Sequence, residues 1–453
     1  MEICPFRGIR YNQEIVRDLA SVICPPYDVV TPEQQNSYYR LSNYNAIRLE
    51  LPPEQPGDNN ANNKYSRAAI ILQQWLKQGV LRIDDYSAFY LHDHYFNYMG
   101  EERRRRGLIA RVKLEPWGTN IYPHEETFSK AKGDRLKLMR ACRANFSPLF
   151  SLYQDTEQKI ASILAEVSQI EPIIDISVPS PSLGEGQGEG EKHVVWAITD
   201  PSLICRISHF LTVQPLYIAD GHHRYETALA YQLERARRLP SVASNEAPNR
   251  VREKFPEFFG WNYIMMELVD FSDPGLVILP LYRLVRGIAP STLAKLESQL
   301  THFFTLEFVP LTEAFRDPFH VTRPRIRDRV LGILGLKPQS LVALKQRQGI
   351  SIESVTSCNR SQAYKEFSVS LLNHIILDKM LEVTANKSNI AYTVDLSEAY
   401  QQIKEGKYQL AFLLNPPQPG IVKAVVNAKD RLPRKSTYFY PKLPAGLIIT
   451  PLD

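Results

Sequence analysis

The sequence predicts an α+β protein, and three stretches of the chain support that class. Residues 88–114 have the pattern of a β-hairpin, with strands at 88–96 and 108–114 joined by a turn at Met99-Gly100. Residues 215–238 predict a short apolar strand that turns directly into a helix. Beyond residue 290 the two types are mixed: we expect helices near 291, at 362–383 and at 396–405, and strands at 304–311, 330–334, 341–344 and 408–414.

The length of 453 residues suits two or three domains. We expect an N-terminal α+β region over residues 1–120, a core over 121–285 and a C-terminal α+β domain over 286–453. The Gly-, Ser- and Glu-rich stretch 177–191 cannot bury a core, so we expect a flexible insertion there. The polar stretch 241–254 is expected to form a mobile loop.

The composition indicates a globular protein of the cytoplasm. Hydrophobic residues make up 44% of the chain and charged residues 23%, which is ordinary for such proteins. A net charge of +5 is small for this length, so we do not expect nucleic acid as a partner. The five cysteines are scattered without a C-x-x-C pair, which fits a reducing compartment. No apolar run approaches membrane-spanning length, so we expect no membrane partner; the oligomeric state is not predicted.

Local signals place two helices in the first region. Thr31 followed by Pro32 and Gln34 predicts a helix start with a capping box. Residues 64–78 form an amphipathic pattern that Gly79 ends.

The predicted hairpin at 88–114 carries two polar features. His92 and His94 lie two residues apart on one strand, so they share a face and could bind a metal, but no third ligand is evident from the sequence. The run Arg103 to Arg106 falls at the tip or rim of the hairpin. We interpret it as a solvated charge run in preference to a nucleic-acid contact.

The strongest functional signal is Asp220-Gly221-His222-His223-Arg224, at the break between the predicted strand and helix. Free backbone N–H groups and the helix dipole favour an anion at a helix start, and arginine binds phosphate with two parallel hydrogen bonds. This pattern therefore favours a phosphate site. The alternative is a helix start at which the histidines only cap or pack.

Two further polar clusters lie far from this turn in the sequence. One is the loop His124-Glu125-Glu126-Thr127, which precedes a helix expected at 133–143 with Lys132 and Arg135 near its start. The other is the tail at 432–442, which combines basic residues, hydroxyls and aromatics. The alternative interpretation of the first cluster is a capped helix with solvated charges. The alternative for the tail is a terminal edge strand.

The chain is identified as a member of the DUF1015 family, a bacterial and archaeal family known by a domain-of-unknown-function label, over nearly its whole length. The resemblance rests on Pro25-Pro26-Tyr27-Asp28-Val29, His124-Glu125 with Thr127, Lys132 and Asp134-Arg135, Asn145 with Ser147-Pro148, Ala219 to Tyr225, and Lys435 to Lys442. One departure is Leu281-Tyr282-Arg283, where the family pattern has Thr-His-Arg.

The turn also resembles motifs with known ligands. Residues 221–226 are similar to the phosphate-binding turn of sulfiredoxin, although His222 stands where that enzyme has its reactive cysteine, which excludes its chemistry. The same turn resembles the nucleotide-binding turn of ParB-type proteins. The order of Pro123-His124-Glu125, the turn and the tail residues 433–441 resembles that of ParB-fold free serine kinases. These resemblances imply a ParB/sulfiredoxin-like mixed α/β core, with the C-terminal domain returning to the site.

The resemblance to the kinases implies a nucleotide-binding phosphotransferase that acts on free serine or a similar small hydroxyl metabolite, with ATP or ADP and Mg²⁺ as cofactors. Glu125 is the expected base, with Asp220 and His222 also catalytic and Asp220 a candidate Mg²⁺ ligand. Gly221, His222, His223 and Arg224 are expected to hold the nucleotide phosphates, and His124, Thr127, Lys132, Arg135, Lys435, Ser436 and Thr437 the substrate. The alternatives are a non-catalytic nucleotide-dependent switch, a phosphatase with the same geometry, and a DNA-binding regulator.

Overall fold

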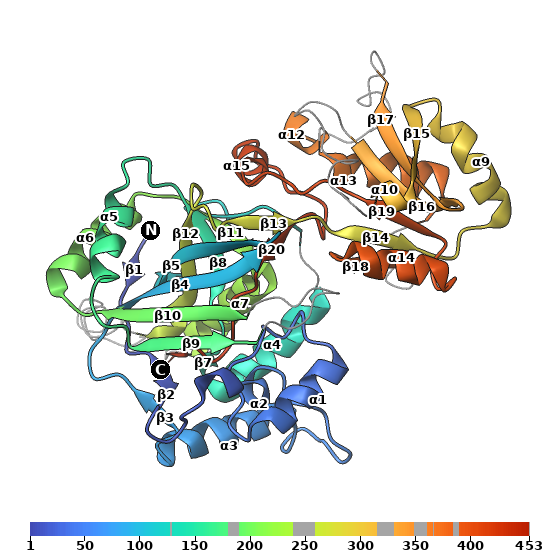
Figure 1. Cartoon of the computed structure of the whole chain (residues 1–453). Helices are drawn as coiled ribbons and strands as arrows, with labels where there is room; N and C mark the ends of the chain where they lie inside the picture. The colour runs from blue at the N-terminus through green and yellow to red at the C-terminus, as the bar shows by residue number, and fades with distance from the viewer. Residues whose placement is uncertain are drawn as a thin grey trace.

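The computed structural model describes residues 1–126, 129–179, 190–238, 259–314, 330–347, 360–365, 367–383 and 389–452. Figure 1 shows two bodies, a larger one around a nine-stranded sheet and a smaller one around a six-stranded sheet. Both chain ends lie on the larger body, so the chain leaves it for the smaller body and then returns (Figure 1).

The nine-stranded sheet has the order β6-β11-β8-β12-β5-β4-β10-β9, with β1 pairing alongside β5. Its strands are β1 (Ile3–Cys4), β4 (Phe89–Tyr98), β5 (Glu101–Lys113), β6 (Ile121–Pro123), β8 (Leu149–Tyr153), β9 (Ile174–Val178), β10 (Glu191–Ile198), β11 (Leu216–Asp220) and β12 (Tyr263–Asp270). The β11–β6 and β12–β8 pairs are parallel and the other pairs antiparallel. The sheet is therefore mixed, and it takes strands from both sides of residue 120.

Helices cover the larger body as the local signals predict. They are η1 (Leu19–Ser21), α1 (Pro32–Leu41), α2 (Ile47–Glu50), α3 (Lys64–Lys77), α4 (Ser129–Cys142), α5 (Lys159–Val167), α6 (Pro201–Thr212), α7 (His222–Arg238) and η2 (Gly260–Asn262). Thr31 and Gln34 form the predicted capping box at the start of α1. At the start of α5 the Asp155 carboxylate accepts the backbone N–H groups of residues 159–161.

The smaller body is built on an antiparallel sheet in the order β15-β17-β16-β19-β14-β18. Its strands are β14 (Tyr282–Val285), β15 (Phe304–Pro310), β16 (Val330–Lys337), β17 (Ser340–Gln346), β18 (Ile390–Thr393) and β19 (Leu410–Leu413). The helical elements are α9 (Pro290–Leu300), α10 (Leu311–Ala314), α12 (Gln362–Lys365), α13 (Ser368–Leu371), η4 (Leu372–Met380), α14 (Leu396–Lys404) and α15 (Gly420–Asn427). Large apolar residues such as Phe304, Phe412 and Ile376 fill its core.

The C-terminal tail returns to the larger body through short strand pairs. β20 (Tyr438–Tyr440) pairs with β13 (Val277–Leu279), and β21 (Thr450–Pro451) pairs with β7 (Ala144–Asn145). A last two-stranded pair joins β2 (Ile9–Tyr11) to β3 (Leu81–Ile83). The pairing of β20 and β21 with the larger body carries the tail past the start of α7 and over the large sheet.

The predicted hairpin at 88–114 is confirmed as β4 and β5. The interpretation of the arginine run as a solvated tip is wrong in part, because β5 begins at Glu101 and includes all four residues, of which Arg104 is exposed. Arg105 is fully buried, with its guanidinium bonded to the Tyr440 carbonyl and to His94. Arg105 thus lies against the tail, which a local charge pattern cannot predict.

Other predictions are partly outside the described residues. Of the predicted insertion, residues 180–189 are outside them, while Val178 and Glu191 belong to the paired strands β9 and β10. Residues 241–254 also lie outside. The division at residues 120 and 285 stays a prediction.

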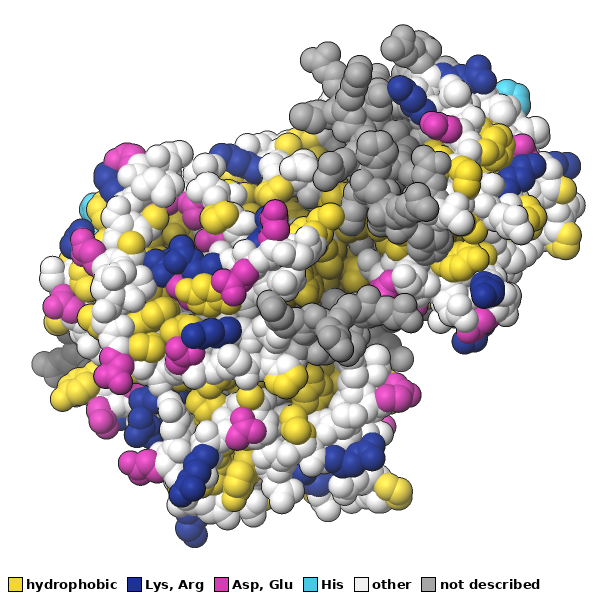
Figure 2. All heavy atoms as spheres, in the orientation of Figure 1, with side chains coloured by type: hydrophobic (Ala, Val, Ile, Leu, Met, Phe, Trp, Pro, Cys, Tyr) yellow, Lys and Arg dark blue, Asp and Glu magenta, His cyan; other side chains and the backbone are white. Residues whose placement is uncertain are grey.

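Among the described helices, none has both the length and the apolar character needed to cross a bilayer. Figure 2 shows basic and acidic side chains interspersed over the visible face.

Candidate functional site

Three segments that are far apart in the sequence meet at one cavity of about 110 Å³. They are the loop after β6, the β11–α7 turn and the C-terminal tail, and a fourth segment from the N-terminal region joins them. The lining residues are Tyr27, Asp28, Val29, Glu125, Glu126, Ala219, Asp220, Gly221, His222, His223, Arg224, Leu281, Arg434, Lys435, Thr437, Tyr438 and Lys442. The segments singled out in the sequence are thus brought together.

Gly221 forms the turn that aims the start of α7 at this cavity. Its φ of +94° lies in the left-handed region that glycine tolerates without strain. A Cβ atom at this position would lie 2.9 Å from Cγ of Leu149. Only glycine therefore lets β11 turn directly into α7, whose first turn presents backbone N–H groups without intrahelical partners.

His124 links the loop, the sheet and the tail. Its Nδ1 lies 2.7 Å from the Ile218 carbonyl oxygen, which can only accept, so Nδ1 carries the proton. Its Nε2 then accepts the hydroxyl hydrogen of Thr437 at 2.8 Å. Burial, partly opposed by the Ile218 carbonyl and Asp220, lowers the pKa of His124 to about 4, so the ring is neutral near pH 7.

Glu125 is fixed by the tail backbone. Its Oε1 accepts the N–H of Lys435 at 2.9 Å, and its Oε2 accepts the N–H of Ser436 at 3.3 Å. Burial raises the pKa of Glu125, although these two bonds act in the opposite direction. Among the described residues each carboxylate oxygen accepts one hydrogen bond and has a second lone pair, so Glu125 can still accept a proton from a hydroxyl group.

Asp220 lies between two cations. Its Oδ2 accepts from Nη2 of Arg224 at 3.1 Å, and its Oδ1 accepts from Nζ of Lys442 at 2.5 Å. Burial alone would raise the pKa of Asp220, but Lys442 and Arg224 hold it well below the usual range. Each Asp220 oxygen accepts one of these hydrogen bonds and has a second lone pair that could face a cation. The assignment of Mg²⁺ to Asp220 stays a prediction.

The paired histidines do not oppose the helix dipole, because they are neutral. Burial lowers the pKa of both His222 and His223. The Nε2 of His222 accepts the backbone N–H of His124 at 3.4 Å, so its Nδ1 carries the proton. His222 therefore offers an N–H donor beside the first turn of α7.

Several predicted binding residues are engaged by the protein itself. Arg224 donates to Oγ of Ser147 and to the Pro148 carbonyl, both at 2.9 Å, as well as to Asp220. Arg135 binds the Glu50 carbonyl at 2.6 Å and Asp134. These two guanidinium groups hold the N-terminal and core segments in place beside the cavity.

The remaining predicted residues differ in their surroundings. Lys132 forms an ion pair with Glu226. Ser436 is buried and donates its hydroxyl to the Pro433 carbonyl at 2.5 Å. Lys435 is exposed at the cavity. Thr127 lies outside the described residues.

Four further residues contribute to the site, although the sequence motifs assign no role to them. Tyr27 and Asp28 line the cavity, Lys442 pairs with Asp220, and Arg283 donates to the Lys435 carbonyl at 3.1 Å. Tyr27, Asp28 and Lys442 belong to segments that carry the family resemblance, which was the available signal. Arg283 follows the two residues that differ from the family pattern, and the first of these, Leu281, lines the cavity.

A larger recess of about 610 Å³ lies elsewhere, between the Asn-rich loop that precedes α3 and the helix α4. Lys64, Lys137 and Arg140 are among its lining residues, and the cavity described above shares none of them. The smaller cavity has the convergent histidines, carboxylates and helix start, so it is the better candidate for chemistry.

The chain belongs to the family described as "Protein of unknown function (DUF1015)", whose model matches residues 3–374. No curated protein matches the sequence significantly.

Three of the solved structures with a similar arrangement illustrate the range of the likeness. A conserved hypothetical protein from Pyrococcus furiosus is 12% identical, with 74% of this chain and 93% of that one covered at a TM-score of 0.33. A free serine kinase in complex with AMP is 11% identical, with coverages of 73% and 86% at a TM-score of 0.32. SbnI with a C-terminal truncation, from Staphylococcus aureus, is 10% identical, with coverages of 74% and 84% at 0.33.

Proposed function

We propose that the protein is a nucleotide-dependent phosphotransferase that acts on a small hydroxyl metabolite, with free serine as the first acceptor to test. The observation that supports this most is the meeting of Glu125, the first turn of α7 and the tail at one cavity. Phosphoryl transfer depends on positioning and on neutralising phosphate charge, and it needs a group that orients the attacking hydroxyl. The same residues carry the resemblance to ParB-fold kinases noted in the sequence.

The phosphates would lie at the start of α7. The N–H groups of its first turn, the Nδ1–H of neutral His222 and the exposed ammonium of Lys435 supply donors and positive charge. Neutral imidazoles suit this place, since they donate hydrogen bonds without opposing the helix dipole. Lys442 adds a second ammonium, which Asp220 holds at the cavity.

The acceptor hydroxyl would lie against Glu125. A base works best when its pKa approaches the working pH, and burial moves the pKa of Glu125 in that direction. Clamping by the Lys435 and Ser436 N–H groups fixes the direction of the carboxylate. Thr437 has given its hydroxyl hydrogen to His124, so its oxygen remains as an acceptor for an ammonium or hydroxyl group of the substrate.

The cavity volume limits what it can enclose. At about 110 Å³ it is smaller than the roughly 300–1,000 Å³ of sites that hold drug-sized ligands. It therefore suits the phosphates and the acceptor group, and the nucleoside would extend outward from it.

The direct test incubates the full-length protein with ATP or ADP, Mg²⁺ and free serine, and detects phosphoserine by mass spectrometry. The proposal expects phosphoserine or another phosphorylated hydroxyl metabolite that depends on both enzyme and nucleotide. Tight nucleotide binding without transfer to any acceptor in a small hydroxyl panel would favour the nucleotide-dependent switch. Release of phosphate from phosphoserine without nucleotide would favour the phosphatase.

Glu125→Gln provides the sharpest variant. The amide keeps the size of the side chain but cannot take a proton, so we expect turnover to fall by about 10²–10⁴-fold. Nucleotide affinity should change by less than about threefold, because Glu125 is not assigned to the phosphates. Turnover is measured with saturating nucleotide and affinity by calorimetry.

Glu126→Gln is the matched control. The change from carboxylate to amide is the same at the next residue. Glu126 also lines the cavity, but its carboxylate pairs with Arg360 at 3.0 Å. We expect it to retain near-normal turnover. Normal turnover in Glu125→Gln, or an equal loss in both variants, would remove Glu125 from the mechanism.

A further inference from the structure

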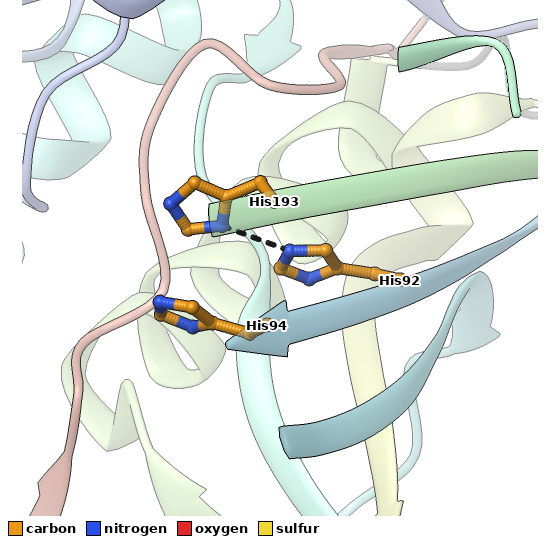
Figure 3. A group of neighbouring side chains, drawn as sticks. All are labelled: His92, His94 and His193. Atoms are coloured by element: carbon orange, nitrogen blue, oxygen red, sulfur yellow. Dashed lines mark hydrogen bonds between the residues drawn. The ribbon is translucent and has the colours of Figure 1, made fainter. Parts of the chain in front are cut away.

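Three histidines from two neighbouring strands face one another beneath the tail (Figure 3). His92 and His94 lie on β4, and His193 is the cross-strand partner of His94 on β10. All three are buried, and one ring nitrogen from each lies within 4.8 Å of the other two. Sequence spacing identified the first two, but the third ligand, about 100 residues away in the chain, comes only from the strand register.

Hydrogen-bond partners fix the protons of the three rings. Nδ1 of His92 lies 2.9 Å from Oε2 of Glu267, so it carries the proton and Nε2 is free to accept. Nδ1 of His193 then donates to that Nε2 at 3.0 Å. The Nε2 of His193 is left as an acceptor 3.9 Å from the Glu191 carboxylate, which also accepts.

His94 is oriented by two charged groups. Its Nε2–H donates to Oε2 of Glu191 at 2.8 Å, while its Nδ1 accepts from Nη2 of Arg105 at 3.2 Å. Burial lowers the pKa of His94 and His193, in keeping with neutral rings. The cluster thus presents nitrogen lone pairs in a buried place between two carboxyl groups.

The carboxylate of Glu267 is also held there by the fold. A Cβ on Gly107 would lie 2.5 Å from Cγ of Glu267, so glycine at this register position makes room for the side chain. The Oε1 atom of Glu267 is buried without a hydrogen-bond partner among the described residues. A buried carboxyl oxygen without a partner is a place where a nearby cation or donor would be stabilised.

We propose that His92, His94 and His193 bind one first-row divalent transition metal, with Zn²⁺ as the leading candidate. The metal would replace the proton shared by Nε2 of His92 and Nδ1 of His193. Their separation of 3.0 Å is close to the roughly 3.3 Å between ligands that are about 2.0–2.1 Å from tetrahedral zinc.

The protons balance in this arrangement. The His193 proton moves from Nδ1 to Nε2 and donates to Glu191, so no proton is lost. Each ring then binds the metal with one nitrogen and donates its other N–H to a carboxylate, Glu267 for His92 and Glu191 for the other two. Carboxylates in this outer position are the usual partners of metal-binding histidines.

Arg105 is the competing cation. Its Nη2 would leave Nδ1 of His94, while its Nη1 keeps the Tyr440 carbonyl at 3.1 Å. The carboxyl groups of Glu191 and Glu267 contact the same cluster and favour a cation there. Imidazole ligands select zinc and its neighbours over Mg²⁺, which prefers oxygen.

The site also has an entrance. A cavity of about 140 Å³ reaches Glu191 and His193, and Tyr438 and Lys442 of the tail line both this cavity and the candidate active site. The proposed metal therefore lies on the other side of the tail from the α7 turn, separate from any Mg²⁺ bound with a nucleotide.

The test begins with wild-type, full-length protein that has been stripped with a chelator. Titration with Zn²⁺ or Co²⁺ should show one equivalent bound, a rise in Tm and, for Co²⁺, the visible absorption of low-coordinate imidazole ligation. Mg²⁺ should produce none of these. Failure of both Zn²⁺ and Co²⁺ to bind stoichiometrically would overturn the proposal, whether or not the protein transfers phosphate.

Variants identify the ligands. His94→Gln and His193→Gln should abolish stoichiometric binding, and Glu267→Gln should weaken it by about 10–100-fold. His209→Gln, on the exposed side of α6, is the control and should bind like wild type. Retained binding in folded His94→Gln protein, or equal loss in the control, would contradict the assignment. The wild-type titration decides the question if a cluster variant does not fold.

Discussion

His124 shows how one residue couples the site to pH. Its folded-state pKa of about 4 lies below the ordinary value of 6.5, so the unfolded chain binds more protons between these values. Stability should therefore fall as the pH drops from about 6.5 to about 4. The loss from this residue is on the order of 3 kcal/mol, since each pKa unit corresponds to about 1.4 kcal/mol.

The variant His124→Asn tests this coupling. Its amide can still donate to the Ile218 carbonyl, but it does not titrate. Urea unfolding at several pH values should show that the stability advantage of wild type over the variant shrinks between pH 6.5 and 4. A constant difference across that range would mean that His124 does not titrate as described.

Gly221 is the residue on which the turn depends. Gly221→Ala places a side chain at a φ of +94° and against Leu149, and we expect a loss of about 1–3 kcal/mol. Gly133→Ala is the matched control, because a Cβ there meets nothing within 4 Å and helix α4 favours alanine. Unfolding free energies should fall in the first variant and stay equal or rise in the second. Equal effects would indicate an unstrained turn.

At the scale of elements, the tail is held to the α7 turn by the ion pair of Lys442 with Asp220. Lys442→Met leaves a buried carboxylate with Arg224 alone, so we expect a loss on the order of 3 kcal/mol. Asp220 has a lowered pKa, so its stabilisation is present above the unfolded value and lost as the pH falls through the folded value. Without Lys442 that loss should begin at a higher pH.

Acid unfolding followed by circular dichroism measures the effect. Lys404→Met, an exposed lysine at the end of α14, is the control and should unfold at the same pH as wild type. An unchanged acid transition in Lys442→Met would show that the tail is not held by this pair.

Local elements were largely predictable, because their signals are local. The capping box of α1, the β4–β5 hairpin and the β11–α7 turn each depend on residues within a few positions of one another. The partners of Arg224, the burial of Arg105 and the arrival of His193 beside His94 depend on strand order and on the path of the tail. No periodicity or short motif contains that information, so these contacts could not be predicted.

At the scale of the whole molecule, the site depends on the return of the C-terminal tail from the smaller body to the larger one. The tail leaves the smaller body and crosses the large sheet, where β20 and β21 pair with strands of the larger body (Figure 1). The mixed α/β class was predicted correctly. The loop, the turn and the tail, which the sequence singled out separately, line one cavity. The ParB/sulfiredoxin-like core stays a proposal.

The most direct measurement is an experimental structure of the full-length protein with ADP. The account predicts that the β-phosphate lies within hydrogen-bond distance of the N–H groups at the start of α7, beside His222 and under the tail at Thr437 and Lys442. Nucleotide bound instead in the larger recess lined by Lys64 and Lys137, with the α7 turn unoccupied, would contradict the account.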